Sequence, residues 1–150
     1  MGQLSVCPRE RAFNLLDKGN TNMILGQKQL DKIHDTLTEN LIGSGVQSVM
    51  LIDTAGNVIA SINNGNDTID LYSLAALAAA NFGAMSCMAR IVGEDEFSLL
   101  FHKGEKENIY FCKVNEELLL VNIFNNQISL GFLRLKMSKV VEELLEVLSL

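Results

Sequence analysis

The sequence has 150 residues, of which 48% are hydrophobic, and a formal net charge of −6 at pH 7. A chain of this length buries roughly two-thirds of its unfolded surface, which is enough for one domain with a single core. The lysines and arginines are few and scattered, so a surface that follows phosphate groups has little electrostatic basis. Neither nucleic acid nor an anionic membrane is therefore expected as a partner.

The first 22 residues show no sustained hydrophobic period, which favours a flexible tail before a folded domain over residues 23–150. No signal peptide and no membrane-spanning run of about 18 apolar residues is recognised. Cys7, Cys87 and Cys112 lack the paired spacing of a zinc site or a disulfide framework. We expect a cytoplasmic protein with free thiols, no metal and no cofactor.

The first half of the domain predicts a helix, a hairpin and a second helix. From Leu25 to Leu41, apolar residues recur three and four positions apart, which indicates an amphipathic helix that ends at GSG, residues 43–45. Segments 46–53 and 58–62 are apolar and β-branched, and TAGN between them predicts a tight turn with positive φ at Gly56 and Asn57. A long helix is expected from its cap, Asp70, to residue 92.

The second half predicts three strands and a last helix. FSLLFHK (97–103), NIYFCKV (108–114) and LLLVNIF (118–124) are joined by short polar connections, which favour an antiparallel meander. Residues 130–148 have an apolar face and a charged face, as in an amphipathic helix. Apart from Asn122, LLLVNIF is apolar on both sides, so helices should cover both faces of the sheet.

The predicted fold class is α/β. It has three layers, with helices on both faces of one five-stranded, mostly antiparallel sheet. The element order is helix, strand, strand, helix, strand, strand, strand, helix.

Residues 53–56 read Asp-Thr-Ala-Gly, a string with which small GTPases contact magnesium and the last phosphate. A nucleotide site also needs a G-x-x-x-x-G-K-[ST] loop, and the sequence has none. Asp, Thr and Gly are common in turns, so we interpret the string as a turn. His34 and His102 have no ligand or catalytic partner at a useful spacing. No catalytic residue is recognised, and the protein is not expected to be an enzyme.

The second helix carries one face of small, uncharged residues where a solvent-facing helix would carry lysine and glutamate. Glycine inside a helix costs about 1 kcal/mol relative to alanine, so the face favours close approach of another backbone. The expected core side is the opposite one, with Leu74, Ala78 and Phe82. The small-residue face comprises Ala76, Ala79, Ala80, Gly83 and Cys87, with Tyr72 and Arg90 at its borders.

The third strand is expected at an open edge of the sheet, with no charge or proline over its first five residues. Such an edge favours pairing with its own copy, which would form a twofold homodimer with two small-residue helices on one face. The predicted dimer interface comprises Phe97, Ser98, Leu99, Leu100 and Phe101.

The strings IVGEDEF, FHKGEKENIY and NNQISLGFLRLK carry a resemblance to a known family. Over residues 24–148 the chain resembles the roadblock / dynein light chain domain, in its bacterial MglB-like branch. The resemblance implies a homodimer that binds the GTP form of a small Ras-like GTPase, MglA, and activates GTP hydrolysis. That activity sets cell polarity in gliding motility.

The mechanism that the resemblance implies is conformational. The dimer reshapes the switch segments until the GTPase's own arginine and glutamine face the γ-phosphate. Arg90 is expected to form a salt bridge at the rim rather than act as an arginine finger. The implied GTPase contact comprises Ala76, Ala79, Ala80, Gly83, Ser86 and Cys87, bordered by Tyr72 and Arg90.

Two other functions are compatible with such a domain. Many roadblock domains are scaffolds for a GTPase or a motor complex and do not alter hydrolysis. A small-molecule sensor is the third alternative, but the sequence has no tryptophan and no convergent set of buried polar residues.

Overall fold

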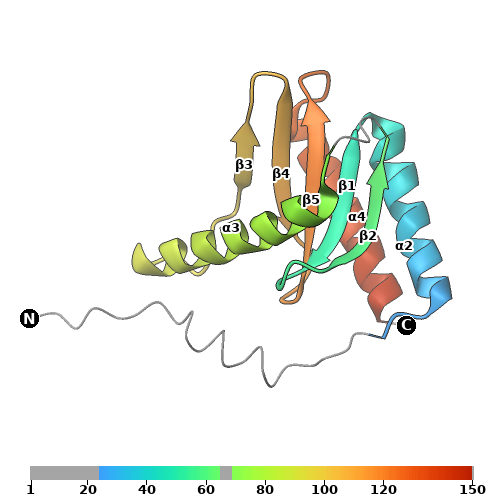
Figure 1. Ribbon diagram of the computed structural model, residues 1–150, viewed down its shortest axis with the longest axis horizontal. Helices are drawn as coiled ribbons and strands as arrows, with labels where there is room; N and C mark the ends of the chain where they lie inside the picture. The colour runs from blue at the N-terminus through green and yellow to red at the C-terminus, as the bar shows by residue number, and fades with distance from the viewer. Residues whose placement is uncertain (1–23, 65–68, 150) are drawn as a thin grey trace, which may run out of the picture.

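The computed structural model describes residues 24–64 and 69–149 (Figure 1). The tail predicted over residues 1–22 lies outside the described residues. The order of elements confirms the prediction. It is α2 (Gln27–Asn40), a short 3-10 helix η1 (Ile42–Ser44), β1 (Ser48–Asp53), β2 (Val58–Asn63), α3 (Leu71–Ile91), β3 (Leu100–Lys103), β4 (Glu107–Lys113), β5 (Leu118–Asn125) and α4 (Leu130–Leu148).

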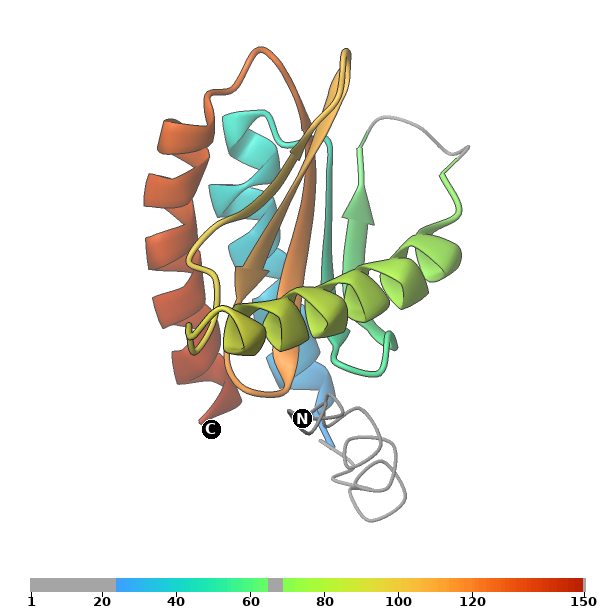
Figure 2. The ribbon, with the colours of Figure 1, turned by 90° about the vertical axis from the view of Figure 1, so that its left-hand side faces the viewer.

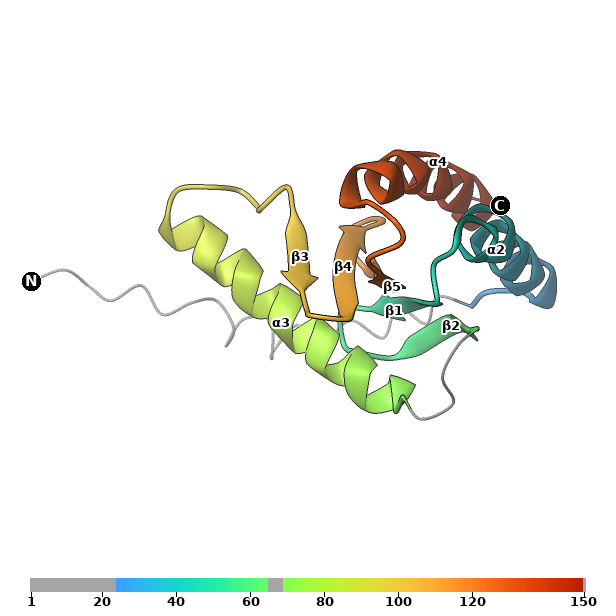
Figure 3. The same cartoon turned by 90° about the horizontal axis from the view of Figure 1, so that it is seen from above.

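The five strands form one sheet in the order β2-β1-β5-β4-β3, and every neighbouring pair is antiparallel. Helices α2 and α4 cover one face of the sheet and α3 covers the other (Figures 2 and 3). The central strand β5 is buried from Leu118 to Phe124, as its two apolar faces predicted. Asn122 is also fully buried there, and its Nδ2 donates to the carbonyl of Tyr110 at 3.3 Å.

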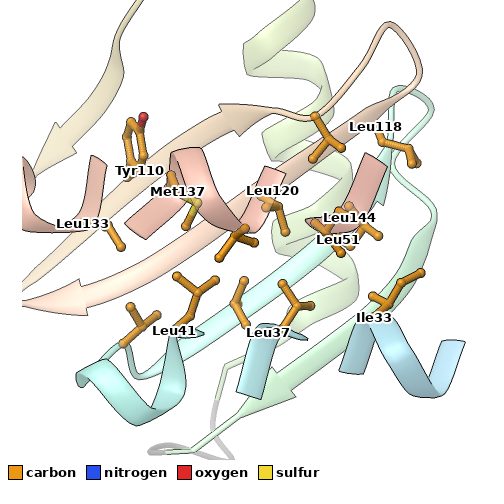
Figure 4. Packing of buried hydrophobic residues seen from close by; sticks show 14 of the residues in the cluster. Ile33, Leu37, Leu41, Leu51, Tyr110, Leu118, Leu120, Leu133, Met137 and Leu144 are labelled. Atoms are coloured by element: carbon orange, nitrogen blue, oxygen red, sulfur yellow. The ribbon is translucent and has the colours of Figure 1, made fainter. Parts of the chain in front are cut away.

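The two faces of the sheet carry cores of different character. Between the sheet and the pair α2 and α4, large aliphatic side chains such as Ile33, Leu37 and Leu144 interdigitate (Figure 4). On the other face, α3 contributes alanines to a smaller cluster. Because alanine adds little bulk, α3 packs close to the sheet. This second cluster comprises Met50, Ile52, Ala75, Ala78, Ala79, Phe111, Leu119 and Val121.

The Asp-Thr-Ala-Gly string is the turn between β1 and β2. Asp53 Oδ1 accepts hydrogen bonds from the backbone N–H groups of Ala55 (3.0 Å) and Asn57 (2.9 Å), and Oδ2 accepts one from Asn57 Nδ2 (2.8 Å). Gly56 has a φ of +90°, as predicted, but Asn57 has no positive φ, so that part of the prediction was wrong. Asp53 holds Asn57 through two nitrogens, and glycine alone takes the left-handed conformation.

Gly56 also touches the backbone of α3. A Cβ atom at this glycine would lie 2.9 Å from Ala76 Cα and 3.4 Å from the Ala75 carbonyl oxygen. The glycine is therefore required both by its φ angle and by the closeness of the helix.

Strand β3 is shorter than predicted. The sequence pattern indicated a strand over residues 97–103, whereas β3 begins at Leu100 and residues 97–99 lie outside the ladder. Helix α3 extends past the edge of the sheet, so the chain returns to β3 from outside the sheet (Figures 1 and 3). A salt bridge from Glu96 to Lys113 Nζ (2.9 Å) holds this returning segment near the end of β4.

Two expectations about side chains and composition need correction. Cys112 is a free thiol, and burial raises its pKa. Cys87 is disulfide-bonded, so the expectation of free thiols is wrong at that position.

Among the described residues, α3 alone has the length and apolar composition of a membrane-spanning helix, with a mean hydropathy of 1.4. Because four of its alanines are buried within the domain, we interpret it as a helix of the folded domain.

We predict that Gly56→Ala destabilises the domain more than Gly93→Ala does. Both glycines have a φ near +90° (90° and 88°), but a Cβ at Gly93 would meet no atom within 4 Å. Each substitution should lower the free energy of unfolding by about 1–2 kcal/mol, because alanine disfavours the left-handed conformation. Gly56→Ala should lower it by roughly a further 1–3 kcal/mol, because the new Cβ clashes with α3. Denaturant unfolding at one protein concentration measures the difference. An equal decrease in the free energy of unfolding for both variants would show that the contact between Gly56 and α3 does not restrict the side chain at that position.

Asp70 caps the N-terminus of α3 and gives a pH-dependent prediction. Its pKa is lowered, first by the hydrogen bond from the Ser73 hydroxyl and then by that from the Ser73 N–H. The stabilisation is therefore present above the carboxyl's ordinary pKa and is lost as pH falls through the lowered value. We expect Asp70→Ala to destabilise at pH 7 but to match the unsubstituted protein at strongly acidic pH, as measured by thermal unfolding. Asp70→Asn keeps a cap and should lose most of this pH dependence.

Candidate functional site

The exposed face of α3 is apolar over most of its length. No charged residue occurs between Asp70 and Arg90, although much of this helix faces solvent. At Gly83, a Cβ atom would meet nothing within 4 Å. The chain itself therefore does not need glycine here, even though glycine costs about 1 kcal/mol relative to alanine in a helix. The open space at Gly83 would admit the close approach of another backbone.

The structure brings most of the predicted GTPase contact together on this face. Ala76, Ala80 and Gly83 are exposed, and Tyr72 and Arg90 flank them. Two further members of the predicted set, Ser86 and Cys87, are half-buried.

Ala79 is not part of the exposed face. It is only 8% exposed and packs in the core beneath α3, so the prediction that it contacts a partner was wrong. The helix is rotated so that the alanines at 75, 78 and 79 face the sheet. Larger residues that were expected at the core centre, such as Leu74 and Phe82, lie at its flanks and are half-buried.

Several large apolar side chains on and after α3 were missed by the sequence analysis. Leu77 is 69% exposed, Met88 50% and Ile91 76%, and the adjacent Val92 is also exposed. Their signal in the sequence was their position outside the predicted core face. They add exposed apolar area to the small-residue face of α3, and burial of such side chains stabilises an interface.

The open edge of the sheet lies next to the C-terminal half of α3. Strand β3 pairs only with β4, so its outer backbone groups have no neighbouring strand among the described residues. Of the predicted dimer residues, Phe97 and Leu99 are exposed, and Ser98 lies between them. Leu100 and Phe101 are half-buried.

Phe101 and Leu100 point to opposite faces of the sheet. The Phe101 ring stacks on Phe124 at 6.0 Å between centroids, on the side of α2 and α4, while Leu100 packs with the cluster beneath α3. A strand that paired with β3 would thus meet an apolar side chain on both faces.

His102 joins the edge strand to α3. Its Nε2 lies 3.0 Å from Asn81 Nδ2, and its ring meets Phe111 edge-on at 5.7 Å. His34 is exposed on α2. Within residues 24–64 and 69–149, no group of three or more His, Cys, Asp or Glu side chains could hold a metal ion.

Lys113 fixes the segment that leads into the edge. Its Nζ lies 2.9 Å from Glu96 and 2.8 Å from Glu116, and the hydrogen bond to Glu116 is the main cause of its raised pKa. The same contact lowers the pKa of Glu116. The apolar residues between Glu96 and β3 are therefore held beside the sheet.

Comparison with known proteins identifies the family of the chain. The sequence profile of the Roadblock/LC7 domain matches residues 33–124. A search of curated protein sequences gave no match.

Solved structures show the same architecture. MglB from Myxococcus xanthus is 36% identical, with 79% of this chain and 95% of that chain covered and a TM-score of 0.73. The gliding protein MglB from Thermus thermophilus is 28% identical, with 84% and 95% covered and a TM-score of 0.77.

A Roadblock/LC7 domain from Streptomyces avermitilis is 17% identical, covers 71% of this chain and 88% of its own, has a TM-score of 0.60, and shares the fold. The chain therefore belongs to the Roadblock/LC7 domain family, in its MglB-like branch.

Proposed function

We propose that this protein is a cytoplasmic homodimer that binds the GTP form of a small Ras-like GTPase of the MglA type and stimulates its GTP hydrolysis. The single observation that carries the proposal is the exposed, uncharged face of α3 in a chain of the MglB-like branch. A folded domain gains nothing by exposing Leu77 and Tyr72 to water, so a protein partner is the occupant that this face fits. The role proposed is control of polarity in gliding cells.

The proposed mechanism uses shape rather than a donated catalytic group. The α3 face has no carboxylate and no histidine, and Arg90 is its only cation. A rigid surface can shift the GTPase only by binding one switch conformation better than the other. The required rigidity is supported by the close packing of α3 on the sheet and by its contact with Gly56. In the favoured conformation, the GTPase's own arginine and glutamine face the γ-phosphate.

The homodimer is proposed to form by antiparallel pairing of two β3 strands. The short β3 ladder leaves its outer backbone groups available, and apolar side chains lie on both faces of the strand. Residues 97–101 would lie at this boundary, and the two α3 helices would share one face of a continuous sheet.

A scaffold is the alternative function, and it would use the same two surfaces. It differs in one measurable respect, since a scaffold binds the GTPase without changing its rate of hydrolysis. The deciding experiment measures GTP hydrolysis by an MglA-type GTPase with and without this protein, over a range of protein concentrations. Saturable acceleration supports the activator, whereas binding with an unchanged rate supports the scaffold.

We predict that Gly83→Arg abolishes the stimulation of hydrolysis while the dimer survives. An arginine side chain at this open position would occupy the space that a close-approaching switch segment needs. The matched control is Gly131→Arg on α4, because a Cβ there also meets nothing within 4 Å and the residue is exposed. The control should retain full stimulation. Unchanged stimulation by Gly83→Arg, with dimerisation checked by size-exclusion chromatography, would exclude this face as the contact.

We predict that Arg90→Ala weakens the complex only modestly. An exposed rim charge contributes little, so the protein concentration that gives half-maximal stimulation should rise about two- to fivefold. The maximal hydrolysis rate should stay near that of the unsubstituted protein. Loss of the maximal rate with intact binding would instead identify Arg90 as an arginine finger.

A further inference from the structure

The disulfide bond at Cys87 connects α3 to a part of the chain that is far away in the sequence. The chain has three cysteines, of which Cys112 is a free thiol and Cys87 is disulfide-bonded. Within one chain, Cys7 is therefore the one cysteine left to be the partner of Cys87. Cys7 lies outside the described residues, in the segment that precedes α2.

The burial of Cys87 differs from that of the helix surface around it. Residues three and four positions away in either direction are neighbours on the surface of a helix. Cys87 itself is half-buried, whereas its four neighbours are all exposed, namely Gly83, Ala84, Arg90 and Ile91. The bonded cysteine supplies a group that covers this position from the solvent side of α3.

The segment before α2 is long enough to reach this position. Helix α2 begins at the end of the molecule where the β1–β2 turn lies (Figures 1 and 2). That turn contacts α3 at Ala75 and Ala76. Residues 8–23 can span about 50 Å when extended, whereas α3 itself is about 30 Å long.

The sequence around Cys7 matches the surface around Cys87 in polarity. Residues 1–8, MGQLSVCP, contain no charged side chain, and two of the residues before Cys7 are the apolar Leu4 and Val6. The surface around Cys87 carries no charge apart from Arg90 at its border. An uncharged segment can therefore cover this surface without burying an unpaired charge.

We infer that residues 1–8 dock on the small-residue face of α3, that a Cys7–Cys87 disulfide bond holds them there, and that reduction of this bond releases them. Cys87, Gly83 and Ala80 belong to the proposed GTPase contact, so the docked segment and the GTPase compete for one surface. The inference rests on the proposed function, to which it adds redox control. The reduced protein is the form that binds the GTPase.

The release step is a thiol–disulfide exchange. A thiolate of a dithiol reductant attacks one sulfur of the bond and forms a mixed disulfide, and the other protein sulfur leaves and takes up a proton. The second thiol of the reductant then displaces the remaining protein sulfur, so the reductant becomes a disulfide and the protein carries two thiols. Exchange with a small-molecule disulfide restores the bond. Disulfide bonds in a mesophile's cytoplasm are usually transient and either catalytic or redox-sensing, which agrees with this use.

The first test identifies the bond. Full-length protein is equilibrated with oxidised glutathione and digested without a reductant. Mass spectrometry should then find the peptide of Cys7 joined to the peptide of Cys87. Recovery of Cys87 as a free thiol, as a glutathione adduct or as a link between two copies would overturn the inference and leave the proposed function in place.

The second test measures stimulation of an MglA-type GTPase by the oxidised protein and by the same protein reduced with dithiothreitol. The oxidised protein should need a roughly tenfold higher concentration for half-maximal stimulation. Cys7→Ser should match the reduced protein with or without dithiothreitol. The matched control is Cys112→Ser, which removes the free thiol on β4 and should keep the full redox response.

The outcomes separate this inference from the proposed function. Equal stimulation by the oxidised and reduced proteins, with the bond present, would overturn the inference alone. If the reduced protein and Cys7→Ser both fail to stimulate hydrolysis, the proposed activator function fails, and hydrogen exchange tests the docking by itself. The backbone amides of residues 2–7 should exchange roughly tenfold more slowly in the oxidised than in the reduced protein. Equal exchange rates would show that the segment does not dock on α3.

Discussion

The contact between α3 and the sheet is the interaction on which the rest of the structure depends. It is made by alanines against Met50, Ile52 and the apolar faces of β4 and β5, and by Gly56 against the backbone of the helix. Alanines at the centre of the contact bring the helix close to the sheet, and Leu71, Leu74 and Phe82 pack at its flanks. The exposed face carries no charge before Arg90, and large apolar side chains such as Leu77 remain on it. The candidate binding surface follows from this arrangement.

The opposite layer shows why α3 can be used in this way. Helices α2 and α4 bury a full set of large aliphatic residues on the other face, including Ile33, Leu37 and Leu144, so the domain has its main core there. The cluster under α3 adds a second and smaller core. The domain can therefore present an apolar helix to a partner without relying on that helix for most of its buried surface.

The sequence predicted the elements well because each carried a strong period or a strong terminator. Asp70 capped α3, Gly56 closed the hairpin, and the continuous apolar run of β5 indicated a strand covered on both faces. The phase of α3 was harder to predict, because alanine fits either a core or a surface. Ala79 was therefore placed on the wrong side.

Long-range geometry accounts for the other errors. The length of β3 depends on how far α3 projects past the sheet, which no local pattern records. The exposure of Leu77 and Met88 also depends on the close seating of the helix, since apolar residues in a helix are ordinarily assigned to a core. The candidate site was thus predicted by its small residues, while its large aliphatic half emerged only from the three-dimensional arrangement.

The second border of the sheet limits how far assembly can proceed. Strand β2 is also a border strand, and its sequence VIASIN carries no charge either. However, the ladder between β1 and β2 has an irregularity at Leu51 and Ile52, and α2 packs along β2. A bulge twists a border strand away from the flat shape that further strands need. Addition of a further strand is therefore disfavoured at β2, whereas the β3 ladder carries no such irregularity.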